Sequence, residues 1–506
     1  MGITSLGLVL LPLGLIWATN PVRLLQLAFV AAIFEAGAAL VFGSFGLQPA
    51  LVPGLIFVAY VCAQYALGMR YQGEAQILKT FAPLLALLAY ALLSILVLPD
   101  AFQGRIMVWP QRPDMLNPGY VPLTFTAGNV TQTLYLALYT VVAIAAGLLV
   151  TRSGFRFDAL LRAYLLGGYG VILLTFWDFA YRIAGVPFPK DFVYSNPNWA
   201  IVNQTIGPVP RIQATFSEPA ALAFYLSGLF FCCLWLNARG HRIMRVDLLL
   251  GLAILAMLCS TSTTGILTLA AGFPLLIAFA TLTGNGRAVV RLARKGGALL
   301  LAGTLLIGPL FILVPSLQGS VNEVVTATLS KGDSQSYAER SGLDAAALAT
   351  LAQTDGLGVG WGSFRASSLI PGIAANGGVF GLAMVLILVT QVVRLLRRAG
   401  HRHRHGHAGS LVLDGFGAAL AGQLAAALLS APTIGSIAFY LQLGCVTGIA
   451  ARMLVDRRSP QLGVPASVPA GVQAGVPAGR LRGPGLAARP GPTLAAQTPG
   501  RGGQFA

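Results

Sequence analysis

The sequence has little charge and few acidic residues. Only 10% of its 506 residues are charged, and 16 acidic residues face 33 lysines and arginines. Hydrophobic residues make up 56% of the chain, and the mean hydropathy is +0.75. A soluble chain of this length cannot bury so much apolar surface, whereas a bilayer accepts it as a solvent. The composition therefore excludes a soluble protein and indicates a membrane protein.

Histidine and cysteine also give no sign of a metal or redox centre. Apart from His241, every histidine lies in the tract HRHRHGH (401–407), whose basic surroundings favour a solvated loop over a metal site. The five cysteines lie in apolar runs without metal-ligand spacing. The long polar loops carry no D-x-D motif or clustered carboxylates. We therefore expect neither a metal nor a cofactor.

Long apolar runs predict an all-α polytopic membrane protein with about 12–13 transmembrane helices. A span needs about 20 mostly apolar residues, and helices satisfy their own backbone hydrogen bonds in lipid. The first run lacks a basic leader and an A-x-A site, so we expect it to be a retained span. The predicted spans cover 3–19, 24–45, 48–69, 80–98, 129–150, 159–182, 219–237, 247–262, 264–283, 297–315, 371–393, 411–430 and 432–451.

The loops between these runs alternate in charge, which predicts their orientation. Short loops rich in lysine and arginine face the cytoplasm by the positive-inside rule. The long loops 99–128, 183–218 and 316–370 hold seven basic and nine acidic residues, so we expect them outside. The membrane domain then covers 1–458. The Pro/Gly/Ala-rich segment 459–506 has no periodicity and is expected to be a disordered cytoplasmic tail.

The second outer loop ends in RIQATFSEPAALAFYL, where a polar segment runs directly into an apolar helix. Pro219 suits the first turn of that helix and Ser217 its N-cap. The positive helix N-terminus and Arg211 together predict an anion site at the outer membrane boundary. Glu218 has three open roles: complementing the helix dipole, orienting Arg211, or acting as a base toward a sugar hydroxyl.

Arginines in the outer loops run against the positive-inside trend. Arg211, Arg340 and Arg365 each lie close to a membrane entry point, where a lipid-linked phosphate or pyrophosphate would sit. A guanidinium binds phosphate through two parallel hydrogen bonds. The alternative interpretations are snorkelling and salt bridges to acidic neighbours. These neighbours are Glu218, Glu339 and Asp344.

The third outer loop predicts an amphipathic helix over 336–355 that lies on the membrane surface. Its apolar stripe contains Leu343, Ala347 and Leu351, and Arg340 precedes Asp344 by four residues. The segment GLGVGWGSFR follows. It has no preceding βαβ unit and no Walker lysine, so its glycines favour close approach of backbone to a ligand or a neighbouring helix over nucleotide binding.

Two carboxylates lie inside apolar runs, which makes them functional candidates. Asp178 has Arg182 four residues further on, so a structural ion pair is the simpler interpretation. Glu35 has no partner that the sequence identifies.

Three segments, in this order, resemble the O-antigen polymerase and O-antigen ligase family of bacterial surface-polysaccharide glycosyltransferases. In that family an arginine precedes an F-S/T-E-P-type helix start, a Ser/Thr-rich hairpin follows, and a large periplasmic loop carries arginine and a G-x-G-x-G segment. The matching segments are RIQATFSEPAALAFYLSG, STSTTGILTLAAG (260–272) and ERSGLDAAALATLAQTDGLGVGWGSFRASSLIPGIAANGGVFGL (339–382).

The resemblance implies a C-type glycosyltransferase fold in the bacterial inner membrane, with short helices in a large periplasmic loop and an active site facing the periplasm. The donor would be an undecaprenyl-pyrophosphate-linked oligosaccharide. Neutralising the leaving group would be the main catalytic contribution, without a metal. Glu218 and Arg211 would be catalytic, and the substrate-binding residues would be Arg211, Arg340, Arg365, Ser217 and Ser367. The expected partners are membrane lipid, a chain-length regulator and export proteins, but not nucleic acid.

One departure from the family pattern bears on the reaction. Ligases of the family usually carry a periplasmic histidine that is taken to activate the acceptor. The matching stretch here, RASSLIPGIAANGG, has Arg365, Ser367 and Ser368 but no histidine. This favours a polymerase that joins repeat units of an exopolysaccharide or O-antigen, with Glu218 as the candidate base. The alternatives are ligase-type transfer to another acceptor and a lipid-linked sugar flippase, although no internal repeat is visible.

Overall fold

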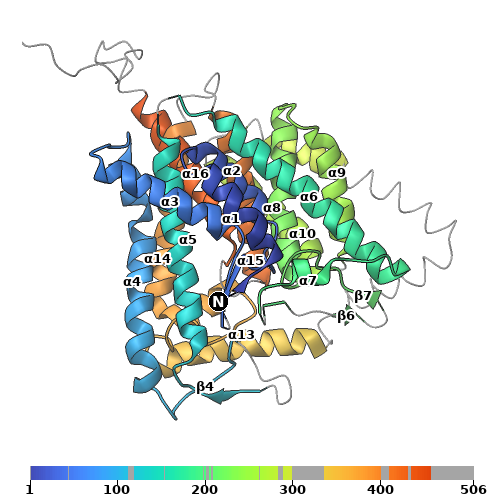
Figure 1. Ribbon diagram of the computed structural model, residues 1–506. Helices are drawn as coiled ribbons and strands as arrows, with labels where there is room; N and C mark the ends of the chain where they lie inside the picture. Colours follow the sequence, from blue (N-terminus) through green and yellow to red (C-terminus); the bar gives the residue numbers. More distant parts are fainter. Residues whose placement is uncertain are drawn as a thin grey trace, which may run out of the picture. The chain divides into compact units, whose positions relative to one another are not determined.

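Helices make up most of the chain in the computed structural model (Figure 1). The structure describes residues 2–43, 45–111, 119–152, 154–197, 199–200, 204–206, 209–260, 262–282, 286, 289–298, 335–400, 409–430 and 435–456. The predicted tail 459–506, the HRHRHGH tract and nearly all of the predicted span 297–315 lie outside these residues.

Eight helices among the described residues are long and apolar enough to cross a membrane, and they confirm eight of the predicted spans. Each runs for 19 residues or more, which meets the length that a bilayer requires. They are α4 (Glu74–Ala101), α5 (Ala127–Val150), α6 (Phe157–Ala184), α8 (Pro219–Arg239), α10 (Thr263–Leu282), α14 (Leu369–Gly400), α15 (Ser410–Ser430) and α16 (Ile437–Val455).

Four other predicted spans form helices that are shorter than expected. They are α1 (Ser5–Ile16), α2 (Pro21–Ala31), α3 (Leu51–Ala66) and α9 (Val246–Cys259), with 12, 11, 16 and 14 residues. The prediction of one helix over 24–45 is wrong, because α2 ends at Ala31 and an irregular turn and a β-hairpin follow. Glu35 therefore lies in a turn and not inside a span.

Short strands, which the sequence did not predict, lie in the loops. The strands β1 (Gly2–Ile3), β2 (Leu40–Phe42) and β3 (Phe45–Leu47) form an antiparallel sheet. Two-residue strands make the hairpins β4 (Met107–Val108) with β5 (Val121–Pro122), and β6 (Thr205–Ile206) with β7 (Val209–Pro210). With α7 (Lys190–Val193) and α13 (Gln335–Gln353), these hairpins come from the three loops predicted to face outward. In Figure 1, α13 lies across the lower end of α4, α5 and α14, with β4 beside it.

The core is built around α8, whose side chains are almost all buried. Small residues let other helices approach it and one another closely, as is common in membranes. A Cβ atom on Gly422 of α15 would lie 2.5 Å from the Phe231 ring of α8. Added Cβ atoms on Gly444 and Gly448 of α16 would likewise crowd the carbonyl oxygens of Ala143 and Gly147 in α5. This close packing fixes the position of the N-terminal end of α8.

The segment GLGVGWGS passes between three helices, which confirms the predicted close approach to neighbouring helices. Gly356, Gly358, Gly360 and Gly362 all have φ between +78° and +94°, a region that favours glycine. A Cβ atom on Gly358 would lie 2.7 Å from the carbonyl oxygen of Ala375 in α14. Cβ atoms on Gly360 and Gly362 would crowd α4 and α5.

Replacing Gly358 with alanine should therefore destabilise the protein. The new methyl group meets backbone atoms in a strained conformation, so we expect a cost of about 1–3 kcal/mol and a lower melting temperature in detergent. Gly251→Ala is the matched control, because that glycine lies in α9 with nothing within 4 Å of its added Cβ atom. Equal melting temperatures for the two variants would contradict the account of the glycine segment.

Candidate functional site

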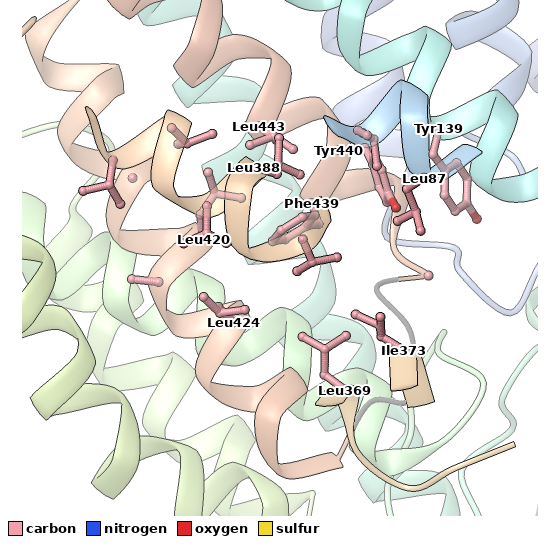
Figure 2. Close-up of a pocket in the computed structure, with 18 of the residues that line it drawn as sticks. Leu87, Tyr139, Leu369, Ile373, Leu388, Leu420, Leu424, Phe439, Tyr440 and Leu443 are labelled. Atoms are coloured by element: carbon pink, nitrogen blue, oxygen red, sulfur yellow. The ribbon is translucent and has the colours of Figure 1, made fainter. Parts of the chain in front are cut away.

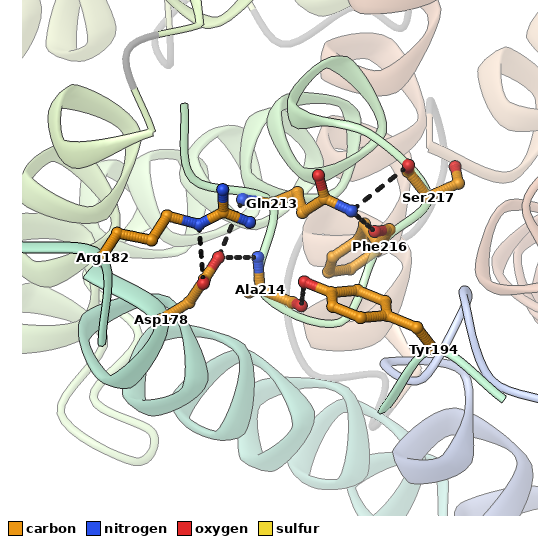
Figure 3. A network of polar contacts seen from close by, with 7 residues as sticks. All are labelled: Asp178, Arg182, Tyr194, Gln213, Ala214, Phe216 and Ser217. Atoms are coloured by element: carbon orange, nitrogen blue, oxygen red, sulfur yellow. Dashed lines mark hydrogen bonds and ion pairs between the residues drawn. The ribbon is translucent and has the colours of Figure 1, made fainter. Parts of the chain in front are cut away.

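A buried ion pair holds the segment that precedes α8 (Figure 3). The Asp178 carboxylate in α6 accepts a bond of 2.9 Å from Arg182 Nε, which confirms the predicted pair. Its other oxygen accepts the backbone N–H groups of Gln213 and Ala214, at 3.1 and 2.9 Å. Tyr194 donates its hydroxyl to the carbonyl oxygen of Ala214, which has a positive φ of 51°. Asp178 of α6 thus fixes the conformation of the loop between Arg211 and Glu218.

The turn after α2 supports the same segment from another direction. The Thr215 hydroxyl donates to the carbonyl oxygen of Ile33, and Ala36 N–H donates to the carbonyl oxygen of Thr215 at 2.9 Å. The Glu35 carboxylate accepts Ser217 N–H at 2.7 Å and the Ser217 hydroxyl at 3.3 Å. The prediction that Ser217 is the N-cap is wrong. Glu218 occupies the N-cap in an extended conformation, and Pro219 follows as the first helical residue, as predicted.

Arg211 lies half-buried with unused hydrogen-bonding capacity. One terminal nitrogen, Nη1, donates to Gln204 Oε1 at 3.1 Å, while the buried Nε has no hydrogen-bond partner among the described residues. Burial lowers the pKa of Arg211, the charge of Arg340 lowers it further, and the charge of Glu218 raises it. The charges of Glu218 and Arg340 therefore both act on Arg211, although Arg340 comes from a different loop.

Arg365 brings a second cation to Glu218. Its Nη2 atom lies 4.0 Å from Glu218 Oε2, and about a third of each side chain is exposed. The position of Arg365 is fixed by its neighbours. Its N–H donates to the carbonyl oxygen of Trp109, and the Asn376 side chain bonds to both the N–H and the carbonyl group of Phe364. Glu218 thus contacts Arg365, which lies far from it in the sequence, and its charge also acts on Arg211.

The helix predicted in the third loop exists as α13, but two of its predicted contacts differ. Ala347 on the apolar stripe is fully buried in a protein cluster with Val359 and Phe364, so this part of the stripe packs on protein and not on lipid. Asp344 does not pair with Arg340 among the ion pairs of the described residues. It accepts the backbone N–H groups of Ser367 and Ser368, at 2.7 and 3.0 Å.

The remaining contacts place Arg340 beside the last residue of α15 and Ser367 beside the start of α14. Arg340 Nη1 donates to the hydroxyl of Ser430, the last residue of α15, at 3.2 Å. Ser367 is half-buried and lies just before α14, tied by its backbone to Asp344. In the Ser/Thr-rich segment, Ser262 Oγ is buried and has no hydrogen-bond partner among the described residues.

An apolar cavity of about 240 Å³ lies among α4, α5, α10, α14, α15 and α16 (Figure 2). Leucine side chains such as Leu388 and Leu420 point into it, with Tyr139 and Tyr440 on one wall. Leu369 also lines it, only four residues after Arg365, and Leu388 lines it beyond the kink that α14 makes at Gly378. A long apolar chain could therefore enter the cavity while a polar head remains near the arginines.

The residues at this site favour binding of an anion over binding of a metal. Among the described residues, no group of three or more histidine, cysteine, aspartate or glutamate side chains could hold a metal ion. The Asp178 carboxylate is already occupied by Arg182 and two backbone N–H groups. Arg211, Arg340 and Arg365 offer guanidinium donors, which suit phosphate or carboxylate oxygens.

The long apolar helices define the chain as a multi-pass helical membrane protein. No protein-family model matches the chain, and no curated protein matches it in sequence. Any assignment of function therefore depends on the geometry of this site and on the properties of the cavity beside it.

Removing the Asp178 carboxylate should strongly destabilise the protein. Asp178→Ala leaves Arg182, which is 7% exposed, buried without its counter-charge, and we expect a loss of about 3–5 kcal/mol in the free energy of unfolding. The melting temperature in detergent provides the measurement. Asp158→Ala is the matched control, because that aspartate pairs with exposed arginines at the other end of α6 and should cost less than about 0.5 kcal/mol. A normal melting temperature for Asp178→Ala would show that the contacts of Asp178 do not stabilise the protein.

Proposed function

We propose that the protein polymerises undecaprenyl-pyrophosphate-linked oligosaccharide repeat units into exopolysaccharide or O-antigen. The reaction takes place at the periplasmic face of a bacterial inner membrane. The observation that carries the proposal is that Arg365 lies 4.0 Å from Glu218, that the charges of Glu218 and Arg340 both act on Arg211, and that Leu369, four residues after Arg365, lines the apolar cavity. A lipid-linked pyrophosphate has the matching chemistry, because it joins a strongly anionic head to a long apolar chain.

The arginines favour departure of the lipid pyrophosphate. In the reaction, a sugar hydroxyl of the acceptor attacks the anomeric carbon of the donor glycan. A new glycosidic bond forms as the bond between that carbon and the pyrophosphate oxygen breaks, and the electron pair leaves with the pyrophosphate. Cations placed where this negative charge develops contribute several kcal/mol in related reactions. Arg211 suits this role because its Nε has no partner among the described residues.

Glu218 is the proposed base for the acceptor hydroxyl. It is about 30% exposed, so its carboxylate is accessible to a substrate, and Arg365 lies 4.0 Å away. The proton of the hydroxyl passes to Glu218 as the glycosidic bond forms. Ser217 and Ser367 flank the arginines and are proposed to contact the glycan.

Replacing Arg211 with alanine should abolish formation of long polymer while membrane levels stay normal. We expect a loss of at least about 100-fold, because a donor that stabilises the leaving group is removed. Arg211→Lys should recover little, since an ammonium group cannot form the paired hydrogen bonds of a guanidinium. The measurement is the profile of lipid-linked oligosaccharide and polymer in a complemented deletion strain. Arg105→Ala, an exposed arginine of the first outer loop, is the control.

The same profile separates the competing functions. Single repeat units that accumulate on the lipid carrier while long polymer disappears support the polymerase. Long polymer that remains on the carrier without transfer would favour a ligase instead. Repeat units that accumulate only on the cytoplasmic side would favour a flippase, and the site assignment would then be wrong.

Filling the apolar cavity should slow the use of a long-chain carrier more than that of a short-chain one. Leu388→Trp takes space from the lipid chain. Losing contact with about two methylene groups would weaken binding of the long-chain donor roughly tenfold. Leu386→Trp is the control, because Leu386 lies on the same helix but is 68% exposed. Polymerisation rates would be compared with synthetic long- and short-chain polyprenyl-pyrophosphate donors. Equal sensitivity of both donors to Leu388→Trp would contradict this role of the cavity.

A further inference from the structure

Glu35 is a carboxylate that accepts hydrogen bonds from the segment before α8. It lies deep in the fold, in the turn between α2 and β2, yet part of its surface remains accessible. No lysine or arginine lies within 4.0 Å of it among the ion pairs of the described residues. Burial raises the pKa of Glu35, the hydrogen bonds it accepts lower it, and the charge of Glu218 raises it.

Three donors converge on the two oxygens of Glu35. Oε1 accepts the indole N–H of Trp199 at 2.8 Å and the hydroxyl of Ser217 at 3.3 Å. Oε2 accepts the backbone N–H of Ser217 at 2.7 Å. The orientation of Glu35 is fixed in turn, because the Trp199 ring packs edge-on against Tyr135 at 5.3 Å.

The contact with Ser217 places Glu35 one residue from Glu218. The backbone at Ser217 determines where the extended Glu218 begins and hence where its side chain points. On the other side, Tyr135 and Tyr139 line the apolar cavity, and Tyr139 reaches the Glu35 backbone through Gln48. Hydrogen bonds of Glu35 therefore connect Tyr139 in the cavity wall with Ser217, which precedes Glu218.

A neutral side chain would satisfy these donors less completely but would avoid the cost of a buried charge. A carboxylate accepts on both oxygens, whereas an amide accepts on one and donates from its nitrogen. An unpaired charge inside a protein is expensive, and carboxylates under such conditions concentrate at functional sites. The presence of glutamate at this position therefore points to a role in the reaction.

We propose that Glu35 is a positioning residue that holds Ser217, and through it Glu218, in the orientation required for proton removal from the acceptor. This inference rests on the proposed function. It assigns Glu35 an effect on turnover and not on binding of the pyrophosphate, because Glu35 contacts none of Arg211, Arg340 and Arg365 through a hydrogen bond or ion pair in the described part of the chain.

The test compares Glu35→Gln with Arg211→Ala in protein purified into lipid nanodiscs. Undecaprenyl pyrophosphate is the binding probe, and polymer yield in the complemented deletion strain reports turnover. We expect Glu35→Gln to bind the probe within about twofold of wild type while turnover falls on the order of 100-fold, because a small displacement of a reacting group costs that much. Asp158→Asn, an exposed carboxylate on α6, is the matched control and should behave as wild type in both measurements.

Several outcomes would overturn the inference. Normal turnover by Glu35→Gln would show that Glu35 has no role in the reaction. Loss of probe binding as severe as that of Arg211→Ala would assign Glu35 to the anion site instead. If wild type neither binds the probe nor makes polymer, the proposed function itself fails, and this result is distinct from the other two.

A second variant tests the inference even if Glu35→Gln does not accumulate in the membrane. Trp199→Phe keeps the aromatic contact with Tyr135 but removes the N–H donor to Glu35. We expect a smaller loss of turnover, about tenfold, with normal probe binding and melting temperature. Wild-type turnover in Trp199→Phe, with folding intact, would count against the positioning role.

Discussion

The buried carboxylate of Asp178 is the constraint on which the candidate site depends. A charge that is 1% exposed is stable only when it is fully paired, and Asp178 reaches that state by combining Arg182 with two backbone N–H groups of the loop before α8. A change in the loop conformation would therefore leave one oxygen of this buried carboxylate without its two N–H donors. This fixes the path from Arg211 to Glu218, and the close packing around α8 fixes the helix that follows.

Much of this arrangement follows from the sequence. Eight helices are evident because their apolar runs are long, and the spacing of Asp178 and Arg182 identifies their pair. The arginines were predicted as a group from their depth in the outer loops. The partners of Glu35 could not be predicted, because the apolar run around it looks continuous, whereas the chain turns after Ala31. The role of Asp344 was also missed, because its partners are backbone N–H groups more than twenty residues away.

The hairpins in the loops predicted to face outward show a second limit of sequence patterns. Strands of two residues, such as β4 and β5, are too short for any alternation to be recognised. They nevertheless matter for the site, because the residues beside β4 continue as Trp109, whose carbonyl oxygen holds Arg365 N–H. The glycine segment was easier to interpret, since four glycines at alternate positions restrict the possible explanations.

The site is divided between two supports. Arg211 and Glu218 belong to the part anchored by α6 and the turn after α2, whereas Arg340 and Arg365 belong to the loop that Asp344 ties together. The ion pair between Glu218 and Arg365 spans this division at 4.0 Å, partly exposed, which is a weak interaction. A bulky anionic head group that inserted between these two side chains would give Arg365 a stronger partner and would release Glu218 from it. Substrate entry and freeing of the carboxylate would then be a single event.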